Sequence, residues 1–156
     1  MSEKRNINPV EIKIREFKLV KGHIESPFEF QAGNIASFSY KVDLKTGVNF
    51  EERLVRADLV TEVSTVSKEK TEEAIASYHF VFIYHFEPIA DHAKLDESGS
   101  VDWNPYLANA IASITYSTSR GILLSRFQGT IMEDFMLPVV DPNALLDNKP
   151  LSQSTV

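Results

Sequence analysis

The stretch NPYLANAIASITYSTSRGILLSRF, residues 104–127, decides the fold of this chain. Asparagine is a favoured helix N-cap, and Pro105 fits the first helical position, where a missing N–H costs nothing. Gly129 follows as a helix stop signal. We therefore expect one long helix over about residues 105–128.

Two stripes of side chains run along this predicted helix, and no charged residue occurs among residues 105–119. The apolar stripe can pack on a sheet, while the small stripe would let another backbone approach closely. We therefore expect a homo-oligomer with the small stripe at its interface; the alternative is a core helix whose small residues face water. The apolar stripe consists of Leu107, Ile111, Ile114 and Ile122, and the small stripe of Ala108, Ala112, Thr115 and Ser119.

Upstream of the helix, the chain reads as four strands between about residues 10 and 86. In the first, Ile12 and Ile14 alternate with charged residues, whereas Phe17 and Leu19 continue on the opposite parity, so we expect a bulge near Glu16. The second and third strands alternate apolar and polar residues over positions 37–44 and 55–63.

The fourth strand is apolar on both faces in its middle, so both faces should be covered. Its even positions are all aromatic, and its odd positions include two histidines. The aromatic residues are Tyr78, Phe80, Phe82, Tyr84 and Phe86, and the histidines are His79 and His85.

The remaining segments complete the predicted fold. Residues 87–103 read as an acidic loop, residues 142–147 as a short helix behind an Asp-Pro cap, and residues 148–156 as a polar tail. The fold class is therefore α+β in a single domain over residues 1–156. It has a four-stranded, Greek-key-like antiparallel sheet followed by one long and one short helix.

Composition excludes several classes of protein. The 156 residues carry 16 bases and 22 acids, so the net charge of 16 − 22 = −6 argues against a nucleic-acid partner. The absence of cysteine excludes disulfides and thiol chemistry. The polar N-terminus leads into no apolar segment, and no run of 18 apolar residues occurs, so we expect no membrane insertion and a cytoplasmic location.

The chain contains few residues arranged for chemistry. It has no nucleophile elbow and no phosphate-binding glycine loop, and its four histidines do not occur in chelating pairs. His79 and His85 lie about 20 Å apart in an extended strand. We therefore expect no enzyme activity, no cofactor and no metal. Two alternatives remain open: a small-molecule-binding or catalytic module that uses the fourth-strand aromatics with His79 and His85, and a purely structural oligomer subunit.

Apolar side chains exceed what one small core needs. Phe28 and Phe30 lie in the connection after the first strand, and Leu145 and Leu146 lie in the short helix. Such residues either complete the core or indicate association with another copy, a partner or a ligand.

Several short motifs in the C-terminal third resemble the SecB family of export chaperones. They are Asn104-Pro105-Tyr106, Ser119-Arg120-Gly121, Leu137-Pro138-Val139 and Asn143-Ala144-Leu145-Leu146. A looser likeness extends to the front, at Glu25-Ser26-Pro27 and Phe30-Gln31. The strand and helix order also agrees with the family plan.

This resemblance implies an ATP-independent holdase that binds unfolded preproteins for export and assembles as a homotetramer, a dimer of dimers. It implies an apolar client groove built from the connection, the sheet and the second helix. Carried over to this chain, the client-binding residues would be Phe28, Phe30, Phe80, Phe82, Tyr84, Leu145 and Leu146.

The chain departs from the family where better-known members dock the Sec motor ATPase. Glu25 matches one of their acidic sheet positions, Lys21 replaces a neighbouring acid, and the tail lacks an acidic, glycine-containing end. Divergent SecB-like proteins also hold the aggregation-prone antitoxin of a toxin–antitoxin system, so an antitoxin is the alternative client.

Overall fold

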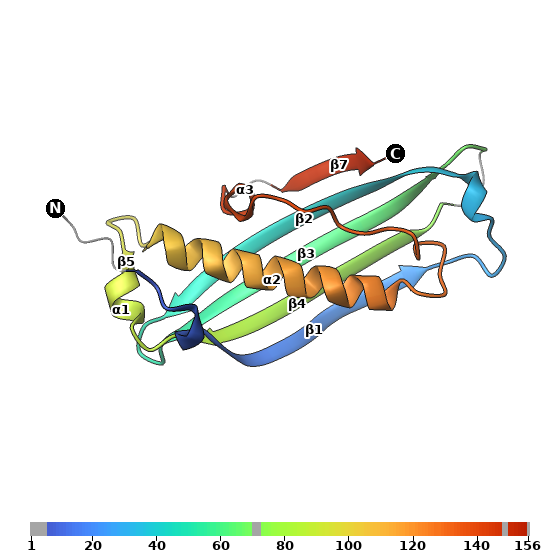
Figure 1. The fold of residues 1–156 in the computed structure, drawn as a ribbon. Coiled ribbons are helices and arrows are strands. Elements are labelled where there is room, and N and C mark those ends of the chain that lie inside the picture. Colours follow the sequence, from blue (N-terminus) through green and yellow to red (C-terminus); the bar gives the residue numbers. More distant parts are fainter. Residues whose placement is uncertain (1–5, 70–72, 148–149, 156) are drawn as a thin grey trace.

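The computed structural model describes residues 6–69, 73–147 and 150–155, and arranges them in two layers. A long antiparallel sheet forms one layer, and helix α2 (Pro105–Arg126) crosses one face of the sheet as the other layer (Figure 1). The predicted α+β architecture is confirmed.

The main sheet has five strands in the order β1-β4-β3-β2-β7. Strands β2, β3 and β4 follow each other as hairpins, and β1 lies beside β4, which is a Greek-key order. The strands are β1 (Lys13–Glu25), β2 (Ile35–Asn49), β3 (Leu54–Ser67), β4 (Ile75–His85) and β7 (Leu151–Thr155).

Strand β7 corrects the prediction of four strands and a polar tail. It pairs antiparallel with the outer edge of β2, from Leu151 opposite Val42 to Thr155 opposite Phe38. The sequence LSQST lacks the apolar alternation by which a strand is recognised. An edge strand needs only main-chain hydrogen bonds on one side, so sequence pattern alone does not find it.

The bulge predicted near Glu16 is confirmed. The register of β1 against β4 shifts between Ile14 and Glu16, and again between Leu19 and Lys21. After the first shift, Phe17 pairs with Phe82, as Ile14 pairs with Tyr84 before it. The bulge therefore returns the apolar residues of β1 to the face that carries α2.

The predicted acidic loop is more ordered than expected. It contains α1 (Ile89–His92) and a small hairpin of β5 (Ala93–Leu95) and β6 (Val101–Trp103). Ile89 and Ala93 are buried, and Gly99 takes the positive φ of +83° that the turn requires. The short elements that remain are η1 (Pro9–Glu11), η2 (Ala32–Asn34) and α3 (Pro142–Leu145).

Helix α2 starts as the sequence predicts. The Asn104 side-chain oxygen accepts hydrogen bonds from the backbone N–H groups of Tyr106 at 2.9 Å and Leu107 at 3.4 Å. This satisfies two of the free N–H groups at the helix start.

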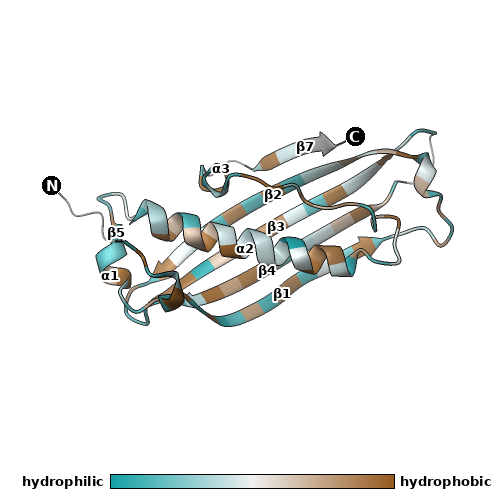
Figure 2. Cartoon of the chain, viewed as in Figure 1, coloured by the Kyte–Doolittle hydropathy of each residue, from teal (hydrophilic) through white to brown (hydrophobic). Residues whose placement is uncertain are grey.

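The aromatic residues of β4 form the core beneath α2. Phe80, Phe82 and Tyr84 are buried, at most 1% exposed. The prediction that these three bind a client is therefore wrong for the folded chain, because the helix covers the sheet face on which they lie. Figure 2 shows brown, hydrophobic bands along the central strands under the helix.

The small-residue stripe of α2 faces the sheet. Ala112, Thr115 and Ser119 are fully buried within one chain, and Ala108 is partly buried. The Tyr84 and Thr115 hydroxyls form a hydrogen bond of 2.8 Å between sheet and helix. The predicted oligomer interface therefore does not fit Ala112, Thr115 and Ser119, whose side chains are already buried within one chain. The large rings of β4 fill the space between the layers, so the helix requires small residues to approach.

The segment after α2 turns back along the helix, and α2 holds it through its backbone. The Arg120 side chain donates to the Leu137 carbonyl at 2.5 Å, and the Tyr116 hydroxyl donates to the Pro138 carbonyl at 2.6 Å. Two of the motifs that carry the SecB resemblance, one around Arg120 and one around Pro138, are therefore in contact.

Candidate functional site: a pocket at the β1–β2 connection

An open pocket of about 920 Å³ lies at one end of the sheet. Its wall combines the β1–β2 connection, the end of β3 with the residues after it, and one residue that follows α2. Lining residues are Pro27, Phe28, Glu29, Phe30, Gln31, Gly33, Asn34, Ile35, Thr65, Ser67, Lys68, Glu69 and Ile131.

Hydrogen bonds tie the connection to its neighbours at both ends. The Ile131 N–H donates to the Ser26 hydroxyl oxygen at 3.0 Å, and the Lys68 N–H donates to the Asn34 carbonyl at 2.7 Å. The pocket wall is therefore fixed to the helix layer on one side and to β3 on the other.

Two phenylalanines of the connection differ in exposure. Phe30 is partly buried and packs against the core, whereas Phe28 is 100% exposed. A fully exposed phenylalanine loses the free energy that burial would supply, about 2 to 3 kcal/mol. Phe28 is therefore an available apolar anchor at the mouth of the pocket.

Polar groups surround this apolar wall. Glu73, next to the pocket, accepts hydrogen bonds from the Ser67 hydroxyl, from the Ser67 N–H at 2.9 Å and from the Thr65 hydroxyl at 2.8 Å. These hydrogen bonds lower the pKa of Glu73 below its usual value, and those from Ser67 have the largest effect. Glu73 thus stays ionised and fixes the end of β3 beside the pocket.

The structure does not gather all the predicted client-binding residues into one groove. Phe28 and Phe30 line the pocket, but Leu145 and Leu146 of α3 do not. Leu145 is buried and Leu146 partly buried, and Asn143 accepts a hydrogen bond from Asn109 of α2 at 3.1 Å. Helix α3 therefore packs against α2, away from the pocket lining.

Sequence reasoning missed the part of the wall that comes from distant segments. Ile131 lies 105 residues after Ser26, to which it is hydrogen-bonded, and Thr65 and Lys68 come from the end of β3 and the residue after it. No local pattern marks Ile131, because its position depends on where the chain goes after α2. The Glu25-Ser26-Pro27 and Phe30-Gln31 motifs were the available signals, and they mark the connection side.

A second apolar surface lies on the helix-side face of β1, which is an edge strand. Ile14, Phe17 and Leu19 share this face and are 37–50% exposed. The Phe17 ring lies with its centroid 5.0 Å from that of Phe82, so it extends the core outward. The parity change in β1 marked these residues, but sequence reasoning did not place them at an edge.

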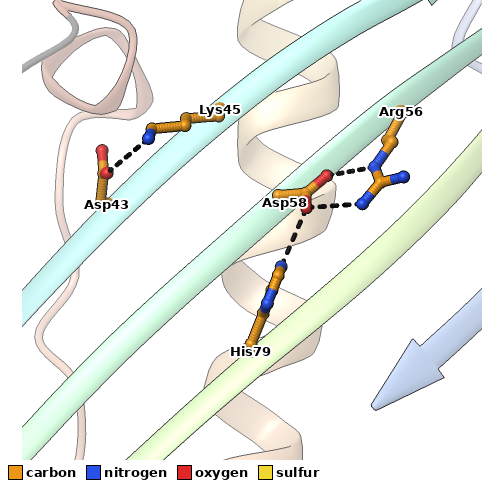
Figure 3. A network of polar contacts seen from close by, with 5 residues as sticks. All are labelled: Asp43, Lys45, Arg56, Asp58 and His79. Carbon is orange, nitrogen blue, oxygen red and sulfur yellow. Dashed lines mark hydrogen bonds and ion pairs between the residues drawn. The ribbon is translucent and has the colours of Figure 1, made fainter. Parts of the chain in front are cut away.

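The opposite face of the sheet carries charges. Asp58 accepts hydrogen bonds from Arg56 at 2.6 and 2.9 Å and contacts the His79 ring at 2.9 Å, with α2 behind the strands (Figure 3). The hydrogen bond from the Arg56 guanidinium is the main reason why the pKa of the Asp58 carboxyl lies below its usual value. The contact with His79 lowers this pKa further.

This placement contradicts the alternative of a small-molecule pocket built from His79, His85 and the β4 aromatics. The histidines lie at odd positions of β4, on the charged face, whereas the aromatic rings lie at even positions under α2. The two sets cannot line one pocket. Among the described residues, no three His, Asp or Glu side chains gather as metal ligands.

No helix within the described ranges is long and apolar enough to cross a membrane.

The backbone is similar to that of a chaperone of known structure. This is the Mycobacterium tuberculosis SecB-like chaperone Rv1957, in complex with a ChAD peptide from the HigA1 antitoxin Rv1956, with a TM-score of 0.55 and 10% sequence identity. The similarity covers 83% of this chain and 90% of that one. No protein-family model and no curated protein matches the sequence. The chain therefore has a SecB-like fold.

Proposed function

We propose that this protein is an ATP-independent holdase that binds non-native polypeptides through the pocket at the β1–β2 connection. The observation that carries the proposal is Phe28, which stands fully exposed at a pocket that also holds Phe30 and Ile131. The SecB-like fold supports it, as does the peptide held by the chaperone of similar fold. The proposal includes no catalysis and no cofactor.

The chemistry of the pocket suits unfolded chains. An apolar wall with a polar rim binds aromatic and aliphatic side chains and does not require a particular amino-acid sequence. Backbone groups such as those of the connection and of strand edges pair with extended peptides of any sequence. The net charge of −6 keeps a protein with exposed apolar groups soluble.

The direct test measures how the protein delays aggregation of a slow-folding client. We expect Phe28→Asp to abolish most of the delay, because a carboxylate replaces the apolar anchor. Val10→Asp is the matched control, because Val10 is also strongly exposed and does not line the pocket. Equal protection by the two variants would contradict the proposal.

For the assembly, we propose a homotetramer, as the resemblance implies, with different contact surfaces from those first expected. The β1 edge with Ile14, Phe17 and Leu19 offers an apolar surface beside an open strand edge. The face of α2 turned from the sheet carries the small residues Ala110, Ser113, Ser117 and Gly121, with Arg120 beside them. Both surfaces suit a second copy of this chain.

For the clients, we propose exported preproteins, and an antitoxin as the second candidate. The antitoxin is favoured by the peptide bound to the chaperone of similar fold and by Lys21, which stands where the family resemblance implies a motor-docking acid. A pull-down with the Sec motor ATPase separates the two: retention supports export, and loss of retention together with protection of a co-expressed antitoxin supports the second. Both roles place the protein in the cytoplasm.

A further inference from the structure

Strand β7 occupies the edge of the sheet next to the proposed client pocket. It runs antiparallel to β2 through five residue pairs, of which Leu151 opposite Val42 is the first and Thr155 opposite Phe38 the last. The edge of β2 thus accepts an extended chain in a defined register.

The sequence LSQST gives the strand that fills this edge few apolar groups. Leu151 is its one apolar residue, and it is only partly buried against the core. Strand β1, by contrast, pairs with β4 through eleven positions and brings in Phe17 and Leu19. Main-chain hydrogen bonds are available to any extended polypeptide, so β7 has no advantage over a segment with more apolar residues.

The direction of β7 leads to the pocket. A chain that continues past Phe38 along the β2 edge passes Ser37 and Ala36 and then reaches Ile35, which lines the pocket with Phe28 and Phe30. In Figure 1 the arrowhead of β7 accordingly points toward the end of the sheet where η2 lies.

We infer that the β2 edge at residues 38–42 is a docking site for an extended segment of a non-native polypeptide, and that β7 is its internal competitor. An incoming strand displaces β7, pairs with β2 and extends into the pocket, where its next apolar side chain meets Phe28. This inference rests on the proposed chaperone function. The preferred segment has apolar residues at alternate positions, because one face of a strand at this edge turns toward the core.

If a client must displace β7 from the β2 edge, the affinity for the client depends on how often β7 occupies that edge. If β7 covers the edge more than nine-tenths of the time, its release raises the apparent affinity at least about tenfold. Covalent retention of β7 has the opposite effect.

The test uses the 156-residue chain, which contains no cysteine. Ser39 and Ser154 are directly opposite in the register, so Ser39→Cys with Ser154→Cys forms a disulfide that retains β7. Leu151→Asp removes the apolar residue and releases β7. The probe is reduced, carboxymethylated α-lactalbumin, which stays unfolded, and the readout is its dissociation constant.

We expect the tightest binding by Leu151→Asp, intermediate binding by the reduced double variant and the weakest binding by its oxidised form. Hydrogen exchange at residues 38–42 should be fastest in Leu151→Asp, which reports release of β7 without any client. Equal, measurable affinities of the oxidised and reduced forms overturn this inference and leave the proposed function standing. Binding by Leu151→Asp but not by the unmodified chain supports the edge and contradicts the holdase proposal. No binding by any form overturns both.

Discussion

At the scale of the residue, the hydroxyl of Tyr84 shows how the two layers are joined. It lies in the core and forms a hydrogen bond with Thr115 of α2. Burial raises the pKa of Tyr84 to about 12, although the bond to Thr115 opposes the shift. Burial likewise raises the pKa of Tyr116, which holds the returning segment, to about 12.

These raised pKa values predict a loss of stability in alkali. Between the unfolded value near 10 and the folded value near 12, the unfolded chain releases the tyrosine proton first, so the free energy of unfolding falls as pH rises. At pH 8, Tyr84→Phe should cost about 1 kcal/mol, because the Thr115 hydroxyl loses its partner. We expect this difference to shrink above pH 10 in urea unfolding. Tyr106→Phe, at an exposed site, is the control; a constant difference across the pH range would contradict the assignment.

The cap of α2 gives a second prediction at this scale. Besides capping the helix, the Asn104 side chain lies 3.2 Å from the Nδ1 atom of His92 in α1. Asn104→Ala should therefore lower the free energy of unfolding by about 1 to 2 kcal/mol. Asn104→Asp, which retains the cap oxygen, should recover most of the loss in the same thermal or urea unfolding experiment. No difference between the two variants would show that the cap contributes little.

The sequence could predict residues whose role is local. The helix start at Asn104 and the bulge near Glu16 follow from short patterns around each residue, whereas the sequence left open whether Phe28 is buried or exposed. The sequence pattern could not predict that Phe80, Phe82 and Tyr84 are buried under α2. An aromatic strand has the same pattern whether a helix of its own chain or a bound client covers it. The pocket residue Ile131 could not be found, since long-range packing sets its place.

At the scale of the element, α2 has two small-residue faces, of which the sequence pattern marked only the one with Ala112, Thr115 and Ser119. Ala112, Thr115 and Ser119 lie against the sheet, and Ser113, Ser117 and Gly121 lie on the other side. Periodicity shows which residues share a face, but it does not show which face meets the larger side chains of β4. Strand β7 was missed for a related reason, because edge pairing leaves no apolar period.

A pair of arginine substitutions on α2 tests this assignment. Ala112→Arg should destabilise the fold by about 4 kcal/mol or more, because a long charged side chain has no room between the layers. Ser117→Arg should leave the fold of one chain intact, since Ser117 is exposed, but should reduce assembly if the outer face of α2 meets another copy. Circular dichroism and light scattering separate the two effects. A folded Ala112→Arg protein would contradict the orientation of the helix.

At the scale of the whole molecule, two of the exposed apolar surfaces bear on the proposed function. One is the pocket at the β1–β2 connection, and the other is the helix-side face of β1. An open strand edge with exposed apolar residues pairs readily with another strand, so stable proteins usually protect it. The two surfaces lie on different elements, so the proposed client binding and the proposed assembly would use separate parts of the molecule.

The last prediction concerns that division. Phe17→Glu combined with Leu19→Glu should lower the molar mass measured by light scattering, because two carboxylates replace the apolar surface of the β1 edge. Val60→Glu is the matched control, since Val60 is 41% exposed, against 42% for Phe17, but lies on the charged face of an inner strand. We expect the dissociated subunits to retain the Phe28 pocket and to bind short client peptides. They should bind a long client more weakly than the assembly does, because a long client can no longer contact several copies at once. An unchanged molar mass would place the subunit contacts elsewhere, and loss of short-peptide binding would show that the pocket depends on assembly.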